Sequence, residues 1–347
     1  MNLGGWGRVL CCLRGRGAAG GIILMYHRVT ELDSDPWGLC VSPAHFAEHL
    51  EVLRQRALPL RLTRLADDLR QGRVSRGAVA ITFDDGYGDN LAHAFPLLRR
   101  ANLPATLFVT TGILTDRREF WWDELEQILL GSNRLPPSLR LTVGGNAHEW
   151  ELGSEGDCRA EEMLRHRRWR TWEPAPTLRH RAYVAQWETL FELPAKEKRR
   201  ALDELCAQAE ITPGQRSTHR TVSAAEIADL AQHKLVEIGA HSVTHTALSR
   251  LSAAGQRREI QGSKKHLEDI LGCRVTSFSY PHGNYDENTL SIVRQAGFTC
   301  ACTTAHATAR PGADPFRLPR IQVLDWDGDE FARQLEACQA TPHPAGT

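Results

Sequence analysis

The sequence predicts an α/β protein built on a parallel sheet, and three observations support this fold class. Short apolar runs of strand length recur along the chain, polar residues follow each run, and helical periodicity fills the intervals between them. This alternation is typical of parallel strands joined by crossover helices. We therefore expect a sheet covered by helices.

Six apolar runs are expected to form the strands. They are IILMY (22–26), VAITF (79–83), ATLFV (105–109), LVEIG (235–239), VTSFS (275–279) and RIQVL (320–324). Helices are expected over residues 89–100, 223–232 and 253–271. Ser223 stands at the N-cap of the second helix and Glu226 follows three residues later, which is the spacing of a capping box.

One long interval does not follow the alternation. Residues 117–219 contain six tryptophans, many arginines and pairs of prolines, and two of its stretches, FWWDELEQILL and AKEKRRALDELCAQAE, have helical spacing. We expect residues 20–116 and 220–338 to form the α/β domain and residues 117–219 to form a mainly helical insertion. Its tryptophans either belong to a local core or line a sugar site, because flat apolar rings stack on pyranose faces.

Composition excludes some classes of partner. The chain of 347 residues has 42 Lys and Arg and 42 Asp and Glu, so no bulk charge draws it to nucleic acid or to an anionic membrane. Its nine cysteines are odd in number and include no CxxC pair, which predicts reduced thiols in the cytosol. No obligate protein partner is indicated.

Residues 1–19 are expected to be a flexible tail. Three arginines interrupt its apolar residues, so it lacks the unbroken apolar region and the cleavage site of a signal peptide. No window of the chain approaches the roughly 18 apolar residues of a transmembrane helix. The alternative is that the segment lies on a membrane surface, which Trp6, Leu10 and Leu13 would contact. We expect a cytoplasmic location, with the inner face of the membrane as the alternative.

Polar residues gather just past the carboxyl ends of five expected strands. In parallel α/β folds this rim is where functional sites are built. A random scatter of histidines and aspartates would not produce such a pattern. The residues are His27, the pair Asp84 and Asp85, the pair His241 and His245, the group Tyr280, Pro281 and His282, and the pair Asp325 and Asp327.

The adjacent carboxylates of Asp84 and Asp85 predict a bound cation. Neighbouring side chains of a strand face opposite sides, but Gly86 permits a turn that aims both carboxylates into one pocket. Two close carboxylates raise one another's pKa unless a positive charge lies beside them. His241 and His245 are four residues apart, so a helix after the strand would place both imidazoles on one face. One carboxylate and two imidazoles leave coordination positions open, as in catalytic metal sites.

At these motifs the sequence resembles the polysaccharide deacetylases of the NodB-homology type, carbohydrate esterase family 4. TFDDG (82–86) is similar to the first family motif and HSVTH (241–245) to the second. The resemblance covers roughly residues 20–116 and 220–335. It implies a distorted (β/α) barrel of seven or eight strands that hydrolyses N-acetyl groups of amino sugars with a divalent metal. Zinc is the expected metal, with cobalt, nickel or manganese as alternatives.

The resemblance also implies the roles of individual residues. Asp84 is then the general base, and Ser242 orients the loop that carries two of the ligands. The third family motif usually begins with arginine, whereas SYPHGNY (279–285) is similar to the YPxG form of the branch that includes the poly-N-acetylglucosamine deacetylases. The implied metal ligands are Asp85, His241 and His245.

In that branch the general acid is a histidine from an early YH motif, which LMYHRV (24–29) matches with His27. The barrel is therefore expected to be circularly rearranged, with its first strand in the place of the last one elsewhere. The chemistry also calls for an N–H group that holds an oxyanion, and the backbone of Tyr87 is expected to supply it.

Two supporting residues have alternative roles. Asp325 either orients His27 or caps the helix that begins near Asp327. Arg320 either pairs with Asp84 or is an ordinary charge at a strand end.

The YPxG segment is expected to line a substrate groove. Tyr280 and Pro281 would shape its wall, and His282 would lie in the groove, with a fourth metal ligand as the alternative role for His282.

Together these features predict a metal-dependent N-deacetylase of carbohydrate. Its substrate would be an N-acetylhexosamine in a polysaccharide, or in a lipid-linked or nucleotide-linked precursor, in cell-surface or exopolysaccharide biosynthesis. One alternative is a deformylase acting on a lipid-linked amino sugar, which differs in the size of its acyl pocket. Another is a catalytically silent carbohydrate-binding protein.

Overall fold

The computed structural model describes residues 20–114, 118–156, 161, 164, 166–212 and 216–340. The expectations for residues 1–19, a flexible tail or a contact with a membrane, lie outside this part of the chain. Within it, no helix combines the length and the apolar composition needed to cross a membrane.

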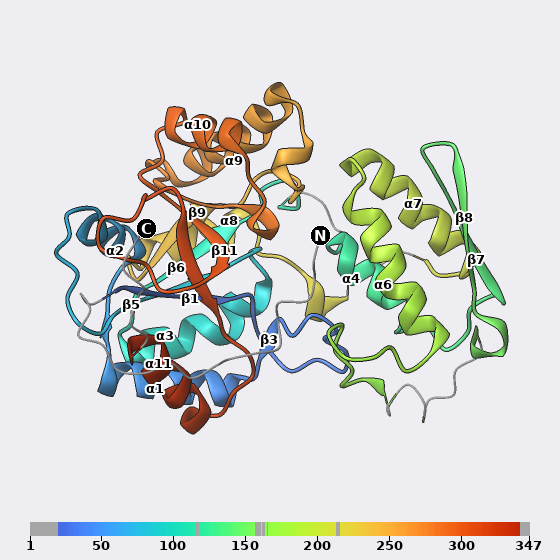
Figure 1. Ribbon diagram of the computed structural model, residues 1–347, viewed down its shortest axis with the longest axis horizontal. Coiled ribbons are helices and arrows are strands. Elements are labelled where there is room, and N and C mark those ends of the chain that lie inside the picture. Colours follow the sequence, from blue (N-terminus) through green and yellow to red (C-terminus); the bar gives the residue numbers. More distant parts are fainter. Residues whose placement is uncertain are drawn as a thin grey trace.

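Seven parallel strands close into a ring, and helices surround it (Figure 1). The order around the ring is β1, β12, β11, β10, β9, β6 and β5, and β5 pairs again with β1. A short strand β4 (Leu58–Pro59) extends the sheet beside β5. The ring strands are β1 (Ile22–Tyr26), β5 (Ala78–Phe83), β6 (Ala105–Val109), β9 (Val236–Ala240), β10 (Ser277–Ser279), β11 (Cys300–His306) and β12 (Leu318–Gln322).

The remaining elements of the barrel connect these strands. Its helices are α1 (Pro43–Arg56), α2 (Leu62–Arg70), α3 (Phe95–Ala101), α8 (Ala224–Gln232), α9 (Ala253–Leu271), α10 (Glu287–Gln295) and α11 (Gly328–Ala340). Shorter elements are the strands β2 (Arg28–Val29) and β3 (Cys40–Val41), the π-helix η1 (Asn90–Ala94), and the 3₁₀ helices η3 (Ser217–His219), η4 (Leu248–Arg250) and η5 (Pro281–Gly283).

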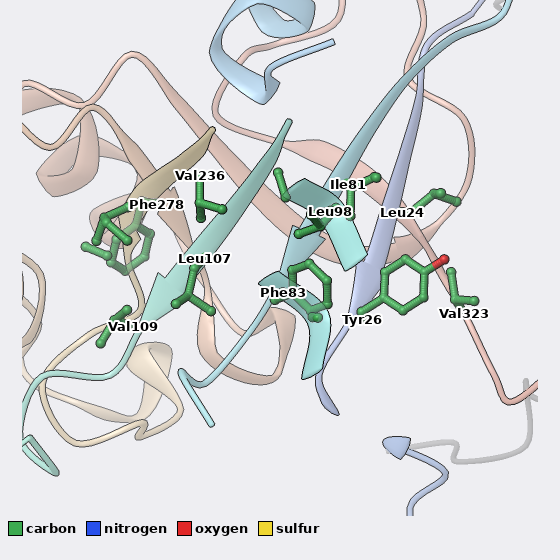
Figure 2. Close-up of a cluster of buried hydrophobic side chains, with 14 of the residues drawn as sticks. Leu24, Tyr26, Ile81, Phe83, Leu98, Leu107, Val109, Val236, Phe278 and Val323 are labelled. Carbon is green, nitrogen blue, oxygen red and sulfur yellow. The ribbon is translucent and has the colours of Figure 1, made fainter. Parts of the chain in front are cut away.

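The side chains of the ring strands divide between two cores. Leu24, Ile81 and Leu107 belong to the larger core, and Figure 2 shows Leu98 of α3 among them. Because successive side chains of a strand face opposite sides, their neighbours point into the ring. There they form a second core, which includes Ile23, Ala80, Phe108, Cys302 and Leu318.

The predicted α/β barrel is confirmed, and the six predicted strands form within two residues of their expected bounds. The seventh ring strand, β11, was not predicted, because its sequence CACTTAH lacks the branched aliphatic residues that mark strands. The helix expected from residue 89 begins as the π-helix η1, and the capping box of Ser223 and Glu226 is present. The first strand lies between β5 and β12 and so closes the ring, and the circular rearrangement stays a prediction.

The insertion forms a second lobe beside the barrel and has a core of its own (Figure 1). It is mainly helical as expected, but it also contains an antiparallel hairpin that was not predicted. The hairpin turns at Gly144 and Gly145, whose φ angles of 57° and 83° suit a type I′ turn. Its second strand is almost fully exposed and so lacks alternating apolar residues. The elements are α4 (Trp121–Leu129), β7 (Ser138–Val143), β8 (Asn146–Glu151), η2 (Gly153–Gly156), α6 (Leu178–Phe191) and α7 (Ala195–Gln208).

A buried ion pair fixes the loop that follows β5. Arg28 Nε donates to Asp89 Oδ2 at 2.9 Å, and both side chains are at most 5% exposed. Asp89 Oδ1 accepts from the backbone N–H of Val29 at 3.0 Å. The guanidinium also lies 4.2 Å from the centre of the Tyr87 ring. These contacts hold the segments that follow β1 and β5 side by side.

Replacing Asp89 by alanine is expected to lower the free energy of unfolding by about 3–5 kcal/mol, because it leaves a buried guanidinium without its carboxylate. Glu51→Ala is a suitable control, since it removes the half-exposed partner of Arg54 and should cost less than about 1 kcal/mol. Urea denaturation of both variants measures the difference. Equal losses would contradict the importance of the buried pair.

Candidate active site

Three side-chain atoms converge at the carboxyl ends of β5 and β9. Asp85 Oδ1 lies 3.5 Å from His241 Nε2 and 3.2 Å from His245 Nε2, and the two histidine nitrogens are 3.1 Å apart. All three residues are buried. Among the described residues this is the one group of His, Cys, Asp and Glu whose donor atoms all lie within 4.8 Å. The sequence predicted each of its members.

The geometry of these atoms fits a metal ion. Tetrahedral bonds of about 2.0–2.1 Å place neighbouring ligands about 3.3 Å apart, close to the separations seen here. Asp85 Oδ1 is buried and has no hydrogen-bond partner, so a cation would satisfy it. Burial alone would raise the pKa of Asp85, but His245 and His241 hold it well below its usual range. The group therefore offers one carboxylate and two imidazoles, the donor set of a zinc site with open positions.

A neighbouring carbonyl sets the tautomer of His241. Its Nδ1 lies 2.8 Å from the backbone oxygen of Ser279 on β10, to which it donates a proton. The lone pair of Nε2 then faces the other two donors. Metal-binding histidines usually have such an outer partner, which fixes the orientation of the ring.

The two histidines lie on a loop and not on a helix, so the expectation that a helix would align them is wrong. Left-handed backbone at Ser242 (φ 62°) and His245 (φ 54°) brings the imidazoles together instead. The Ser242 hydroxyl accepts the backbone N–H of His245 at 3.0 Å, which is the orienting contact expected of it. Asp85 also has a left-handed φ of 73°, followed by Gly86 at 85°, so the turn after β5 begins at the aspartate itself.

Asp84 is bound by Arg320, which is the first of the two roles expected for that arginine. Arg320 donates to both carboxylate oxygens at 2.7 Å, and its side chain is fully buried inside the ring. The Ser279 hydroxyl donates to Asp84 Oδ2 at 3.2 Å, and this oxygen lies 3.9 Å from His241 Nε2. Burial alone would raise the pKa of Asp84, but Arg320 and His241 lower it below its usual value. Asp84 is therefore a carboxylate directly beside the metal-binding group.

His27 follows β1 on the same side of the ring. Tyr26 pairs with Phe83 in the register of β1 and β5, so the next residues, His27 and Asp84, are neighbours at the strand ends. Burial lowers the pKa of His27, and the carboxylates of Asp85 and Asp84 oppose this change. No hydrogen bond of the described residues involves its ring.

Tyr87 is fixed in a polar network below the site. Its hydroxyl donates to Asp123 at 2.7 Å and accepts from the indole N–H of Trp122 at 2.8 Å. The adjacent residues Gly86 and Gly88 bond to the segment 220–222, whereas no hydrogen bond of the described residues uses the backbone N–H of Tyr87. This N–H remains available for the expected contact with an oxyanion.

Asp325 lies outside the site, and both expected roles for it are wrong. It accepts the backbone N–H of Ser42 at 2.8 Å and pairs with His45 Nδ1 at 2.7 Å, so it binds the start of α1. The side chain is 47% exposed. The start of α11 is instead capped by Asp327, which accepts from the N–H of Glu330 at 2.8 Å.

The YPxG segment has a divided role. Tyr280 and Pro281 are buried, and the Tyr280 hydroxyl donates to the carbonyl of Phe316 at 3.0 Å, so these two residues shape the wall from behind. The His282 ring lies 4.4 Å from that of His245, centre to centre, but His282 is not part of the metal-binding group.

Sequence patterns missed two contributors from other elements. Ser279 contacts Asp84, Arg320 and His241, but a serine in an apolar strand gives no signal by itself. Trp122 of the insertion packs edge-on against His245, with ring centres 4.7 Å apart. Its burial fits the expected local core, yet it also forms one side of the site. The spacing of FWWDELEQILL could reveal the helix but not this contact.

The closed parallel ring with Asp, His and His at its carboxyl rim defines a barrel protein of the NodB-homology type. A model of the polysaccharide deacetylase family matches residues 71–131 and 207–301. These stretches include Asp84 and the three metal-binding residues but not His27 or Arg320. Over these two stretches the chain is therefore similar to the polysaccharide deacetylase family.

Individual relatives agree with this family over part of the chain or in fold. YxkH of Bacillus subtilis, whose name describes it as a candidate polysaccharide deacetylase, is 28% identical over 113 residues, which are 32% of this chain and 40% of that protein. The chain thus spans less than half the length of this relative.

Two solved structures share the fold. The Streptococcus pyogenes deacetylase PplD superposes with a TM-score of 0.58 at 16% identity, over 94% of this chain and 100% of PplD. IcaB from Ammonifex degensii gives a TM-score of 0.55 at 20% identity, over 93% of this chain and 98% of IcaB. At these identities the likeness concerns the fold alone.

His241→Ala should reduce bound zinc from about one ion per chain to near zero, because it removes one of three donors. Asp84→Asn should keep about one ion, since Asp84 faces Arg320 and is not one of the donors. Mass spectrometry of zinc after reconstitution and gel filtration measures both. Loss of zinc from both variants would place Asp84 among the ligands, and retention by His241→Ala would exclude the site.

Proposed function

We propose that this protein is a metal-dependent N-deacetylase of an amino sugar. The observation that carries the proposal is the buried group of Asp85, His241 and His245 beside the Arg320-bound carboxylate of Asp84, in a barrel of the polysaccharide deacetylase family. A divalent ion bound by the first three residues would supply a Lewis acid that polarises an amide carbonyl and acidifies water.

Asp84 is the group that would take a proton from the attacking water. Its two contacts with Arg320 keep it ionised and fix its plane. Oδ2 faces the metal-binding histidines at 3.9 Å from His241, so a water molecule beside the metal lies within its reach. The contacts with Arg320 and Ser279 occupy three of the four lone pairs of the carboxylate, so the proton would take the free one on Oδ1 or replace the Ser279 contact on Oδ2.

Two further groups would act on the acyl carbon and the leaving nitrogen. The backbone N–H of Tyr87 would donate to the oxyanion, at a position fixed by the contacts of its side chain with Asp123 and Trp122. His27, at the end of β1, would donate a proton to the departing amine, which would otherwise leave as a poor amide anion.

The proposed substrate is an N-acetylhexosamine, either in a polysaccharide or in a lipid-linked or nucleotide-linked precursor of cell-surface or exopolysaccharide synthesis. An aromatic side chain of the insertion beside the site, the half-buried Trp187, offers a surface suited to a sugar ring. A cytoplasmic location, with the inner face of the membrane as the alternative, completes the proposal.

His27→Ala is expected to slow acetate release by about 10²- to 10⁴-fold without loss of metal, because it removes a proton donor. The assay measures acetate released by the zinc-loaded protein from a panel of free, nucleotide-linked and lipid-linked N-acetylhexosamines and from their oligomers. His45→Ala is the control, since His45 lies outside the site at the start of α1 and should keep the full rate.

Other products would point to other functions. Formate in place of acetate would identify a deformylase, and sugar binding without release of either acid would identify a silent carbohydrate-binding protein. An unchanged rate in His27→Ala would remove His27 from its proposed role.

A further inference from the structure

The insertion contributes an aromatic wall that begins at the metal-binding group. His282 packs against His245, and the rings of Phe191 and Trp187 lie 4.8 and 6.3 Å from that of His282. Trp187 in turn lies 5.5 Å from Trp121 on α4. The wall therefore leads from the proposed catalytic group to Trp121 of α4, which faces the first turn of α7.

A lysine without a counter-charge stands at the far end of this wall. Lys198, in the first turn of α7, is only 5% exposed, and its ammonium lies 4.3 Å over the centre of the Trp121 ring. No hydrogen bond or ion pair of the described residues involves this ammonium. Burial lowers the pKa of Lys198 to about 8, with no carboxylate to oppose the change, so the group still carries its charge at pH 7.

The neighbouring arginine has a different environment. Arg199, next in the chain, pairs with Glu124 and Asp203. Carboxylates of the insertion therefore lie beside Arg199 on one side of α7, but none of the described residues forms an ion pair with Lys198. Burying an ammonium without a carboxylate lowers the stability of the fold. The presence of Lys198 at this position is therefore better explained by a bound ligand than by stability.

Two more buried nitrogens along the wall have no partner. Trp121 Nε1, in the ring under the ammonium, makes no hydrogen bond, and the same holds for His282 Nε2. The indole nitrogen is always a donor, as is the ammonium. The ammonium over the Trp121 ring and the N–H at the edge of the same ring are two donors without an acceptor among the described residues, which is a combination suited to an anion.

We propose that Lys198 and Trp121 bind a negatively charged group of the substrate, a phosphate or a carboxylate carried next to the amino sugar, while the sugar ring lies along Trp187 and Phe191. This inference rests on the proposed function for the identity of the sugar. The phosphate would belong to a nucleotide or lipid link, and the carboxylate to a uronic acid of an acidic polysaccharide.

Binding of two small anions to the full-length chain tests the subsite directly. Isothermal titration calorimetry with inorganic phosphate and with glucuronate, in the presence of EDTA so that no metal-bound phosphate contributes, gives both dissociation constants. Lys198→Met should weaken the preferred anion about tenfold, because one charged contact is lost. Lys196→Met, on the exposed face of the same helix, should stay within about twofold of the unchanged protein. Tighter binding of phosphate favours a phosphate-linked precursor, and tighter binding of glucuronate favours an acidic polymer.

A second pair of variants separates charge from packing. Lys198→Arg keeps the positive charge and should retain binding, and Trp121→Phe keeps a ring but loses the N–H and should weaken binding about threefold. The thermal midpoint of Lys198→Met should not fall, since the substitution removes a buried charge without a partner. Equal losses in Lys198→Arg and Lys198→Met, or no binding of either anion, would overturn the inference.

The outcome is independent of catalysis. If no amino sugar releases acetate but phosphate binding still depends on Lys198, the proposed function fails and the subsite stands. If acetate is released and neither anion is bound, the proposed deacetylase function is supported and the proposed anion subsite is wrong.

Discussion

The contact between Arg320 and Asp84 supports both the barrel and its proposed chemistry. The guanidinium is fully buried and uses its nitrogens on groups from several strands: Asp84 and Thr82 on the β5 side, Ser279 of β10 and the carbonyl of Thr303 on β11. Without Asp84 it would be a buried charge without a partner. The same contact keeps Asp84 ionised and immobile beside the metal-binding group. The contact that neutralises the interior of the barrel therefore also keeps the proposed base ionised.

Unusual backbone conformations concentrate around this contact. Seven non-glycine residues of the described chain have positive φ, and four of them lie at the site. Each such residue costs free energy relative to ordinary backbone, so it persists only where its surroundings hold it. Here the surroundings are identifiable, since the Ser242 hydroxyl binds the next turn and the interior of the ring fixes the end of β5. The four residues are Asp85, Ser242, His245 and His282.

Sequence patterns predicted the features that depend on residue type and on order along the chain. They missed the features that depend on contacts between distant side chains. The apolar runs gave the strands, and polar residues at their ends gave the metal-binding group, because parallel strands bring their carboxyl ends together. The loop conformation at His241 and His245 was not predictable from spacing, since four-residue spacing also suits a helix. The roles predicted for Asp325 were wrong because its place after a strand shows which edge of the sheet it lies at, but not that it binds Ser42 and His45. Ser279 and Trp122 were missed because their roles arise from packing between distant segments.

The ring topology joins distant segments of the described chain. Strand β1 pairs with β5 on one side, but its other neighbour is β12, almost 300 residues away along the chain. Non-local pairings of this kind slow folding, so we expect the contact between β1 and β12 to form late. Arg320 is part of β12, so Asp84 receives its counter-charge only when β12 is in place. The barrel and the carboxylate that we propose as the base would then be completed together.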